Sequence, residues 1–258
     1  MHVNAAHAAI YDDTKDISGW LLPDETEKLY EMAHFHGDVI LEVGTFRGRS
    51  AAVINEGARN QGSRPDRQFF SVDIDPASGF HAYDILAPRR LADRAIFFHG
   101  NLATFRDAFP VTPTMAFIDG DHTYEGVKAD LEQLTTLLAP NTPVAFHDYL
   151  NTDTPGVARA LDDWIAQGFA TKTGEYGCSG FVITTAKCTG GQLRLSEAAF
   201  QAAHREFLAR IGAVKQVQTR LSQTPPSPPS TREKIAELAP WLVPIVRGIK
   251  RAVGMGAK

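Results

Sequence analysis

An imidazole and two carboxylates follow one short apolar segment of the sequence. The segment is Thr114–Ile118, and Asp119, Asp121 and His122 come within four residues of its end. Histidine ordinarily titrates near neutral pH, so His122 is a candidate for proton transfer in catalysis. A purely structural role, in which the acids cap a helix or pair with basic residues, is the alternative at this stage.

A second acid and histidine pair, His147 and Asp148, stands at the end of the apolar segment Val144–His147. Ligands of open α/β sheets gather outside the carboxyl ends of strands, and neighbouring strands lie about 4.8 Å apart. Asp119 and Asp148 could therefore approach one divalent cation from two sides. Carboxylates suit Mg²⁺ or Mn²⁺, and His147 or His122 would accept softer metals. The predicted metal ligands are Asp119, His147 and Asp148.

A glycine-containing turn follows another apolar segment, Asp38–Val43, earlier in the sequence. In residues 39–50, VILEVGTFRGRS, a buried strand leads into Gly44, and a helix is expected to begin after Gly48. Gly44 can adopt backbone angles that other residues avoid and has no side chain to block a ligand. Free N–H groups at the helix start, near Ser50, favour an anionic group. The spacing G-x-x-x-G differs from the G-x-G-x-x-G pattern of dinucleotide-binding proteins, which argues against NAD. The alternative is a tight turn that binds no ligand.

Asp73 ends the apolar segment Gln68–Asp73, within the sequence FFSVDIDP. An acid at the carboxyl end of the neighbouring strand can accept hydrogen bonds from both ribose hydroxyls of a nucleoside. Asp75 lies two residues further on and is the weaker candidate. Helix capping is the structural alternative.

These residues must be positioned by an α/β fold, because short apolar segments alternate with amphipathic ones. The expected strands are Asp38–Val43, Gln68–Asp73, Ala95–His99, Thr114–Ile118 and Val144–His147, and the expected helices are 24–35, 47–59, 84–93, 101–109 and 124–138. This alternation predicts a Rossmann-like, doubly wound, mostly parallel sheet. Phe169–Thr173 and Phe181–Thr185 are expected to form a C-terminal antiparallel edge hairpin, with Pro155–Gln167 as the helix before it.

The chain is expected to end in a helical extension and a basic tail. Residues 1–221 are expected to form one domain whose last helix is Ser196–Leu221, followed by a Pro/Ser linker at 222–230. Residues 231–258 carry six Lys or Arg against two Glu, with apolar residues at near-helical spacing. This tail could contact the inner face of a membrane peripherally or pack as a helix on its own domain or on a second subunit.

Composition excludes several classes of protein. Hydrophobic residues are 43% of the 258 residues and charged residues 22%, which is typical of a protein with a packed core. The net charge of −4 gives no basic field for nucleic acid. Two cysteines are too few for a disulfide framework, and the sequence begins without a signal-peptide pattern. We therefore expect a cytoplasmic protein.

Taken together, the motifs ILEVGTFRGRS, SVDIDP, HGN, FIDGDHTYEGVKADL and VAFHDY resemble those of class I S-adenosylmethionine-dependent methyltransferases. The resemblance covers about residues 17–185. It is strongest to the small-molecule O-methyltransferases, including the macrocin and other sugar O-methyltransferases, and weaker to the catechol O-methyltransferases. It implies S-adenosylmethionine as cofactor, a divalent metal such as Mg²⁺ in metal-dependent members, and a homodimer.

The resemblance also implies roles for individual residues. The residues expected to bind the cofactor are Glu42, Gly44, Thr45, Gly48 and Ser50 at the methionine part, Asp73 at the ribose, Gly100 and Asn101 near the adenine, and Asp119. Asp121 matches a proposed carboxylate base of the sugar group, and His122 stands where the catechol group has a catalytic lysine. His147 stands where several sugar methyltransferases have a second aspartate.

The expected activity is methyl transfer from S-adenosylmethionine to a hydroxyl oxygen of a small molecule, such as a sugar or a glycosylated metabolite, with Asp121 or His122 as base. Two alternatives stay open. The chain could be a catalytically silent cofactor-binding or scaffold protein of the same fold, or it could be a hydroxylase-like relative that depends on Fe²⁺ and O₂.

Overall fold

A mostly parallel sheet organises the chain in the computed structural model, which describes residues 2–60, 65–191 and 193–223. Among these residues, the strands run in the order β3-β2-β1-β4-β5-β7-β6. They are β1 (Val39–Val43), β2 (Gln68–Asp73), β3 (Ala95–His99), β4 (Met115–Ile118), β5 (Pro143–Phe146), β6 (Ala170–Tyr176) and β7 (Ser179–Thr184). The first five strands are parallel, and β7 pairs antiparallel with both β5 and β6. The predicted α/β fold with an antiparallel edge hairpin is confirmed.

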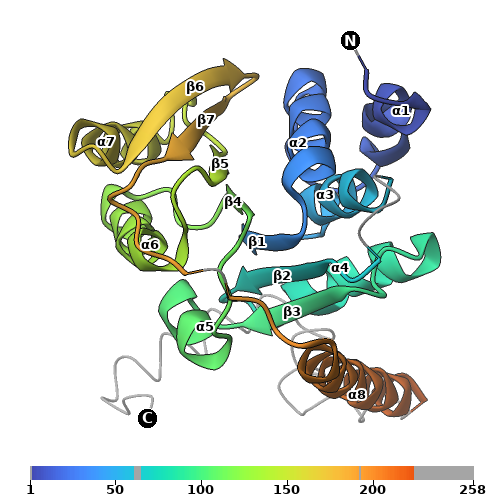
Figure 1. Ribbon diagram of the computed structural model, residues 1–258. Helices are drawn as coiled ribbons and strands as arrows, with labels where there is room; N and C mark the ends of the chain where they lie inside the picture. Colours follow the sequence, from blue (N-terminus) through green and yellow to red (C-terminus); the bar gives the residue numbers. More distant parts are fainter. Residues whose placement is uncertain (1, 61–64, 192, 224–258) are drawn as a thin grey trace, which may run out of the picture. The chain divides into compact units, whose positions relative to one another are not determined.

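Helices cover both faces of this sheet (Figure 1). They are α1 (Ala5–Thr14), α2 (Pro23–His36), α3 (Arg49–Arg59), α4 (Ser78–Leu86), α5 (Leu102–Ala108), α6 (Tyr124–Leu137), α7 (Pro155–Ala166) and α8 (Glu197–Gln223). Helices α1, α2 and α3 contact one another on one face, and α6 contacts both α5 and α7 on the other. The carboxyl ends of all the parallel strands therefore open at a single edge between two helical layers.

Side chains of neighbouring strands alternate between these two layers in matched rows. Glu42 of β1 lies beside Ser71 of β2 and Phe117 of β4, and Phe117 lies beside Ala145 of β5. This row faces α2 and α3, since Glu42 bonds to Ser50 of α3. The next row holds the residues that pack against α5, α6 and α7 in the main hydrophobic core. Burial on both faces explains why these strands are almost wholly apolar.

One predicted helix is in the wrong place. The sequence predicted a helix over 84–93, whereas α4 begins at Ser78 and ends at Leu86, followed by a 3₁₀ turn at Ala87–Arg89. The helix begins early because Asp75 accepts hydrogen bonds from the backbone N–H groups at its start. It ends early because Pro88 lacks an N–H donor and Arg90 adopts a left-handed conformation. Helix α1 was not predicted at all.

The hairpin at the sheet edge is tighter than the sequence suggested. The predicted strands Phe169–Thr173 and Phe181–Thr185 leave residues 174–180 between them, but β6 continues to Tyr176 and β7 begins at Ser179. The turn is therefore only Gly177 and Cys178. Gly177 has a φ of +58°, in the left-handed region that glycine tolerates.

The chain divides into two compact units, Met1–Ala209 and Arg210–Lys258. Within the first unit, Arg94 donates to the Glu197 carboxylate of α8 at 2.6 and 2.9 Å and lies over the ring of Phe200, which is fully buried. The predicted boundary at residue 221 stays a prediction. The predicted tail, and the linker beyond residue 223, lie outside the described residues.

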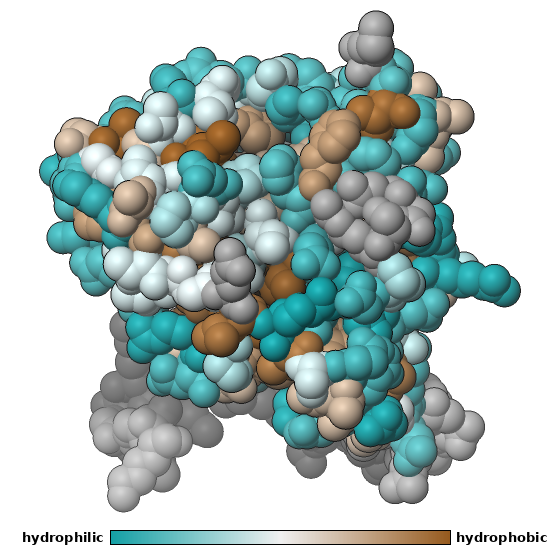
Figure 2. All heavy atoms as spheres, in the orientation of Figure 1, coloured by the Kyte–Doolittle hydropathy of each residue, from teal (hydrophilic) through white to brown (hydrophobic). Residues whose placement is uncertain are grey.

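The described part of the chain contains no helix that is both long enough and apolar enough to cross a bilayer. On the face seen in Figure 2, hydrophilic residues predominate and apolar ones form small patches.

Glu42 is a carboxyl group buried inside the sheet layer. Its side chain is fully buried, and its oxygens accept hydrogen bonds from Ser50 Oγ, at 2.6 Å, and from Ser71 Oγ. Burial raises the pKa of Glu42 to about 8; the nearby charges of Asp119 and Asp73 raise it further, and the two serine hydrogen bonds oppose the shift. Glu42 is therefore mostly protonated at neutral pH.

This pKa predicts a pH-dependent stability. Between the ordinary carboxyl pKa near 4.5 and the native value near 8, the folded protein holds a proton that the unfolded chain has lost. The free energy of unfolding should therefore fall as pH rises through this window, by at most about 1.4 kcal/mol per unit from this group. Glu42→Gln is uncharged in both states and should remove that dependence. Urea unfolding at pH 5 to 8.5 measures the effect.

The matched control is Glu132→Gln, which changes an exposed glutamate of α6 in the same way. It should keep the wild-type slope. If Glu42→Gln and wild type show the same pH dependence, Glu42 is ionised in the native state and the assignment is wrong.

Candidate active site

A cleft of about 790 Å³ lies at the carboxyl ends of the parallel strands. It is lined by the loops that follow β1 to β5 and, from the N-terminal part, by Ser18–Leu21. All but two of the residues singled out in the sequence line it: Gly44, Thr45, Ser50, Asp73, Gly100, Asn101, Asp119, Asp121, His122, His147 and Asp148. The fold therefore brings the glycine turn and both acid and histidine groups to one place.

The turn after β1 is shaped by glycine at its first and last positions. Gly44 has a φ of +91°, and a Cβ built on it would lie 1.9 Å from the carbonyl oxygen of Asp119. Gly48 has a φ of +84° and caps the start of α3, against Ala82 of α4. Any larger residue at Gly44 would push β1 away from β4. Gly48 does not line the cleft, so its contribution is to the path of the turn.

Asp73 holds this turn in place. Its Oδ2 accepts hydrogen bonds from the backbone N–H groups of Thr45 at 2.9 Å and Phe46 at 3.0 Å. Its Oδ1 accepts one from Asp75 N at 2.8 Å. The carboxylate therefore orders the loops after β1 and β2 and also faces the cleft.

Glu42 lies beneath the turn and outside the cleft. Through Ser50 and Ser71 it joins α3 to β1 and β2, and Ser71 in turn contacts Thr45 Oγ1 at 2.5 Å. The structure thus separates the residues at the predicted methionine subsite into two groups. Gly44, Thr45 and Ser50 reach the cleft surface, and Glu42 supports them from below.

Two imidazoles face two carboxylates on the other side of the cleft. His122 Nε2 lies 3.4 Å from Asp119 Oδ1 and 3.2 Å from Asp148 Oδ2. His147 Nδ1 lies 3.2 and 3.3 Å from the same two oxygens. The side chain of His147 is only 5% exposed, whereas that of His122 is 41% exposed. Asp148 has a φ of +60°, a left-handed conformation that aims its carboxylate into this group.

Charge pairing shifts the titration of these groups. The hydrogen bond to Asp119 raises the pKa of His122 above its ordinary value. Burial alone lowers the pKa of His147, but hydrogen bonds to Asp119 and Asp148 outweigh burial and raise it. The pKa of Asp148 is lowered to about 2, chiefly by its hydrogen bond with His147. The contacts therefore favour the protonated imidazole of His147 beside the ionised carboxylate of Asp148.

Asp121 is turned differently from its neighbours. Its Oδ1 accepts a hydrogen bond from Thr123 N at 2.8 Å, and its carboxyl group covers Gly126 in the first turn of α6. Asp121 lines the cleft, but one of its oxygens is already used to start the helix. Nearby, burial raises the pKa of Asp130 to about 6, and the charge of Asp121 adds to the shift.

The segment Ser18–Leu21 forms one wall of the cleft. Arg49 fixes it, because its buried guanidinium donates to Gly19 O at 2.8 Å and lies over the Tyr11 ring. Trp20 is 79% exposed and stacks on Phe46 at the cleft. No local pattern marks this segment, because its position depends on contact with α3.

Comparison with known proteins gives a family match. Residues 41–149 match a protein-family model described as "Methyltransferase domain". Among curated proteins, none matches the chain.

Solved structures share the fold. The O-methyltransferase TomG from Streptomyces achromogenes, involved in tomaymycin synthesis and crystallised with SAM, is 16% identical with a TM-score of 0.55, over 70% of this chain and 88% of TomG. An O-methyltransferase from Bacillus cereus in complex with SAH is 16% identical with a TM-score of 0.54, over 70% and 91%. The SAH-bound methyltransferase PaMTH1 from Podospora anserina is 15% identical with a TM-score of 0.54, over 72% and 89%.

The matched residues contain the glycine turn, Asp73, Asp119 and Asp148, and so include the residues at which the cleft is built. The TM-scores of 0.54 to 0.55 show that the chain shares the fold of these neighbours. Residues 41–149, which hold most of the cleft-lining residues named above, therefore match a methyltransferase domain, and the chain has the fold of solved methyltransferases.

Proposed function

We propose that the protein transfers a methyl group from S-adenosylmethionine to a hydroxyl oxygen of a small molecule, either a sugar or a glycosylated metabolite. The observation that carries this proposal is the single cleft that joins the glycine turn and Asp73 to the Asp119, His122 and Asp148 cluster. Two of the structural neighbours are O-methyltransferases by name, which favours an oxygen acceptor.

In this proposal the cofactor follows the strand ends across the cleft. Its methionine part lies by Gly44, Thr45 and Ser50, with Glu42 and Gly48 as supports, and its adenine by Gly100 and Asn101. Asp73 accepts hydrogen bonds from the ribose hydroxyls with the lone pairs that its backbone contacts leave unused. Asp119, at the next strand end, would then face the methyl donor and the acceptor.

The ribose assignment predicts a loss of cofactor affinity. Asp73→Ala removes the acceptor for the ribose and three hydrogen bonds that order the turn, so affinity for S-adenosylmethionine should fall at least tenfold. Isothermal titration calorimetry measures it, with circular dichroism to confirm the fold. Asp75→Ala, two residues further along, is the control and should bind within threefold of wild type. Equal affinity of wild type and Asp73→Ala would remove Asp73 from this role.

The acceptor hydroxyl must lose its proton as the new bond forms. The oxygen attacks the methyl carbon, the carbon–sulfur bond breaks, and its electron pair stays on sulfur as S-adenosylhomocysteine. His122 is the proposed base in its neutral form, because Asp119 and Asp148 hold its Nε2–H and leave Nδ1 to accept the proton. Asp121 is the second candidate, already engaged at Thr123.

His122→Ala is therefore expected to lower kcat by about 10² to 10⁴-fold, with the KM for S-adenosylmethionine little changed. The assay follows S-adenosylhomocysteine formation with the best acceptor from a panel of glycosides and catechols. Asp121→Asn is the matched comparison and should cost less than about tenfold. A larger loss in Asp121→Asn than in His122→Ala would move the base to Asp121.

A divalent cation fits this end of the cleft. The Nδ1 atom of His147 is buried without a well-aligned hydrogen bond, although it lies within 3.3 Å of carboxylate oxygens of Asp119 and Asp148. We propose that the carboxylates of Asp119 and Asp148 hold Mg²⁺ or Mn²⁺, with His122 alongside. His147, the third ligand predicted from the sequence, lies against the same two carboxylates through Nδ1. The ion would supply positive charge that lowers the pKa of a hydroxyl group bound to it.

Chelation tests this metal. Turnover should fall at least tenfold after treatment with EDTA and return with Mg²⁺ or Mn²⁺, because the charge that favours the alkoxide would be lost and then restored. Asp148→Asn should reduce this recovery. Unchanged turnover after chelation, or recovery with Zn²⁺ alone, would refute a magnesium-type site.

Two different functions are separated by the same assays. Full cofactor affinity with no product from any acceptor would indicate a silent binding or scaffold protein. Turnover that requires Fe²⁺ and O₂ would indicate a hydroxylase-like relative. The proposal further includes a cytoplasmic homodimer. Residues 231–258, which lie outside the described residues, either contact the inner membrane face or pack on their own domain or on the second subunit; these points derive from the sequence.

A further inference from the structure

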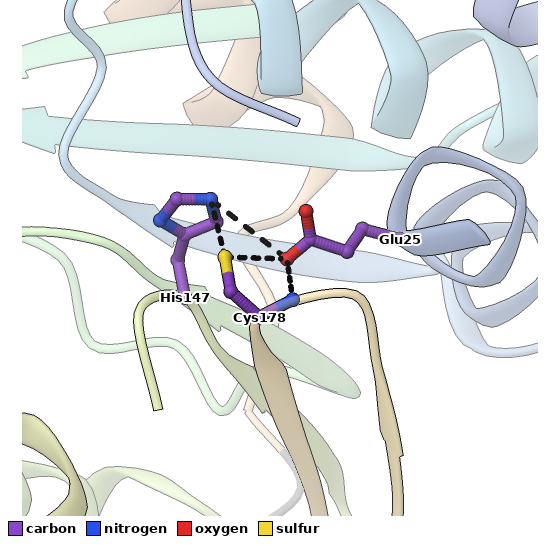
Figure 3. A group of neighbouring side chains, drawn as sticks. All are labelled: Glu25, His147 and Cys178. Atoms are coloured by element: carbon purple, nitrogen blue, oxygen red, sulfur yellow. Dashed lines mark hydrogen bonds and ion pairs between the residues drawn. The ribbon is translucent and has the colours of Figure 1, made fainter. Parts of the chain in front are cut away.

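Three side chains from distant parts of the sequence meet beside the cleft (Figure 3). Glu25 comes from the first turn of α2, His147 from the end of β5, and Cys178 from the β6–β7 turn, and the three point toward one another. Cys178 and Glu25 are 153 residues apart. Neither has a role in the methyl-transfer proposal. We call these three residues the Glu25 cluster.

The donor atoms of the Glu25 cluster are spaced like the ligands of one metal ion. Cys178 Sγ lies 3.1 Å from Glu25 Oε1 and 3.6 Å from His147 Nε2, and Nε2 lies 3.8 Å from Oε1. Tetrahedral zinc, with bonds of about 2.3 Å to sulfur and about 2.0–2.2 Å to nitrogen and oxygen, separates its ligands by about 3.4–3.6 Å. The distance from Sγ to Nε2 lies within that range. The distance from Sγ to Oε1 is shorter and that from Nε2 to Oε1 is longer, each within about 0.4 Å of the range.

The chemistry of the donors is also specific. Thiolate sulfur, imidazole nitrogen and carboxylate oxygen together suit Zn²⁺ and similar borderline-soft ions, whereas Mg²⁺ prefers oxygen ligands alone. Glu25 is only 1% exposed and His147 only 5%. Charged and polar groups buried this deeply need partners, and a cation would serve all three.

The surroundings orient each donor. Glu25 Oε1 accepts from Ser179 Oγ at 2.6 Å and from Cys178 N at 3.2 Å, and Oε2 accepts from Leu22 N at 2.7 Å. The left-handed turn at Gly177 brings Cys178 to this place, and a Cβ on Gly177 would lie 2.3 Å from Glu25 Cγ. Hydrogen bonds that orient the ligands in this way are typical of protein metal sites.

The opposite nitrogen of His147 completes the arrangement. Nδ1 faces the carboxylates of Asp119 and Asp148, so a metal on Nε2 leaves Nδ1–H directed at a carboxylate, as in many zinc sites. The carboxylates of Asp119 and Asp148 then remain together for a harder ion.

We propose that Glu25, His147 and Cys178 bind one Zn²⁺ ion. The ion replaces the thiol proton of Cys178, which leaves to solvent, and no oxidation or reduction takes place. It would join α2, β5 and the edge hairpin, and it would fix the ring of His147 toward the acid cluster. This inference does not depend on the methyl-transfer proposal.

Metal binding to the full-length, reduced protein tests the site without any assay of activity. Zn²⁺ should bind at one equivalent, measured by competition with a chromogenic chelator, and excess Mg²⁺ should not displace it. Co²⁺ in its place should give a thiolate-to-metal charge-transfer band and the intense visible bands of four-coordinate cobalt. Cys178→Ser should lose the charge-transfer band and bind Zn²⁺ at least 100-fold more weakly.

The control is Cys188→Ala, because Cys178 and Cys188 are the only cysteines in the chain. Cys188 is buried elsewhere, and this variant should keep the stoichiometry and the band. Glu25→Gln should weaken Zn²⁺ binding and keep the thiolate band.

The proposal is overturned if the wild type binds no Zn²⁺, if its cobalt form lacks a thiolate band, or if Cys178→Ser binds as tightly as wild type. If Cys178→Ser fails to fold, the spectrum of the wild-type cobalt form decides alone.

Discussion

The contact between Gly44 and Asp119 is the constraint on which the site depends. β1 pairs with β2 and β4 on its two sides, and this pairing continues past the strand ends through Gly44 N to Val72 O at 2.8 Å and Asp119 N to Val43 O at 2.7 Å. Two backbones can approach this closely only where one carries no Cβ. As a result, the turn that would hold the cofactor and the acids that would receive the acceptor open onto the same cleft.

Charge balance is the second organising feature. Asp119 and Asp148 lie at the ends of adjacent strands, where two ionised carboxylates would repel each other. In this structure the imidazoles of His122 and His147 lie between them. Protonated imidazoles and a divalent cation are therefore alternative sources of the same positive charge. The buried Glu42 stays neutral instead, because burial favours the protonated form.

The sequence predicted the parts of the structure that are set by local pattern. The strands β2 and β3 match their predicted bounds, because segments buried on both faces have an apolar composition that is easily recognised. Asp73, Asp119 and Asp148 were found because strand ends converge in any parallel sheet. Patterns could not show that Glu42 and Gly48 lie beneath the cleft surface, because that depends on how α3 and α4 pack around the turn.

The meeting of Glu25 and Cys178 could not be predicted, because it depends on how the start of α2 packs against the turn of the edge hairpin, which local sequence does not specify. His147 shows how narrow the geometric condition is. Side chains alternate along a strand, so His147, two residues after Ala145, falls on the face that carries α2 and Glu25. A register shift of one residue in β5 would turn the imidazole toward α6 and α7, away from Glu25 and Cys178 and from both carboxylates. The register of a single short strand thus determines whether one imidazole can serve two clusters.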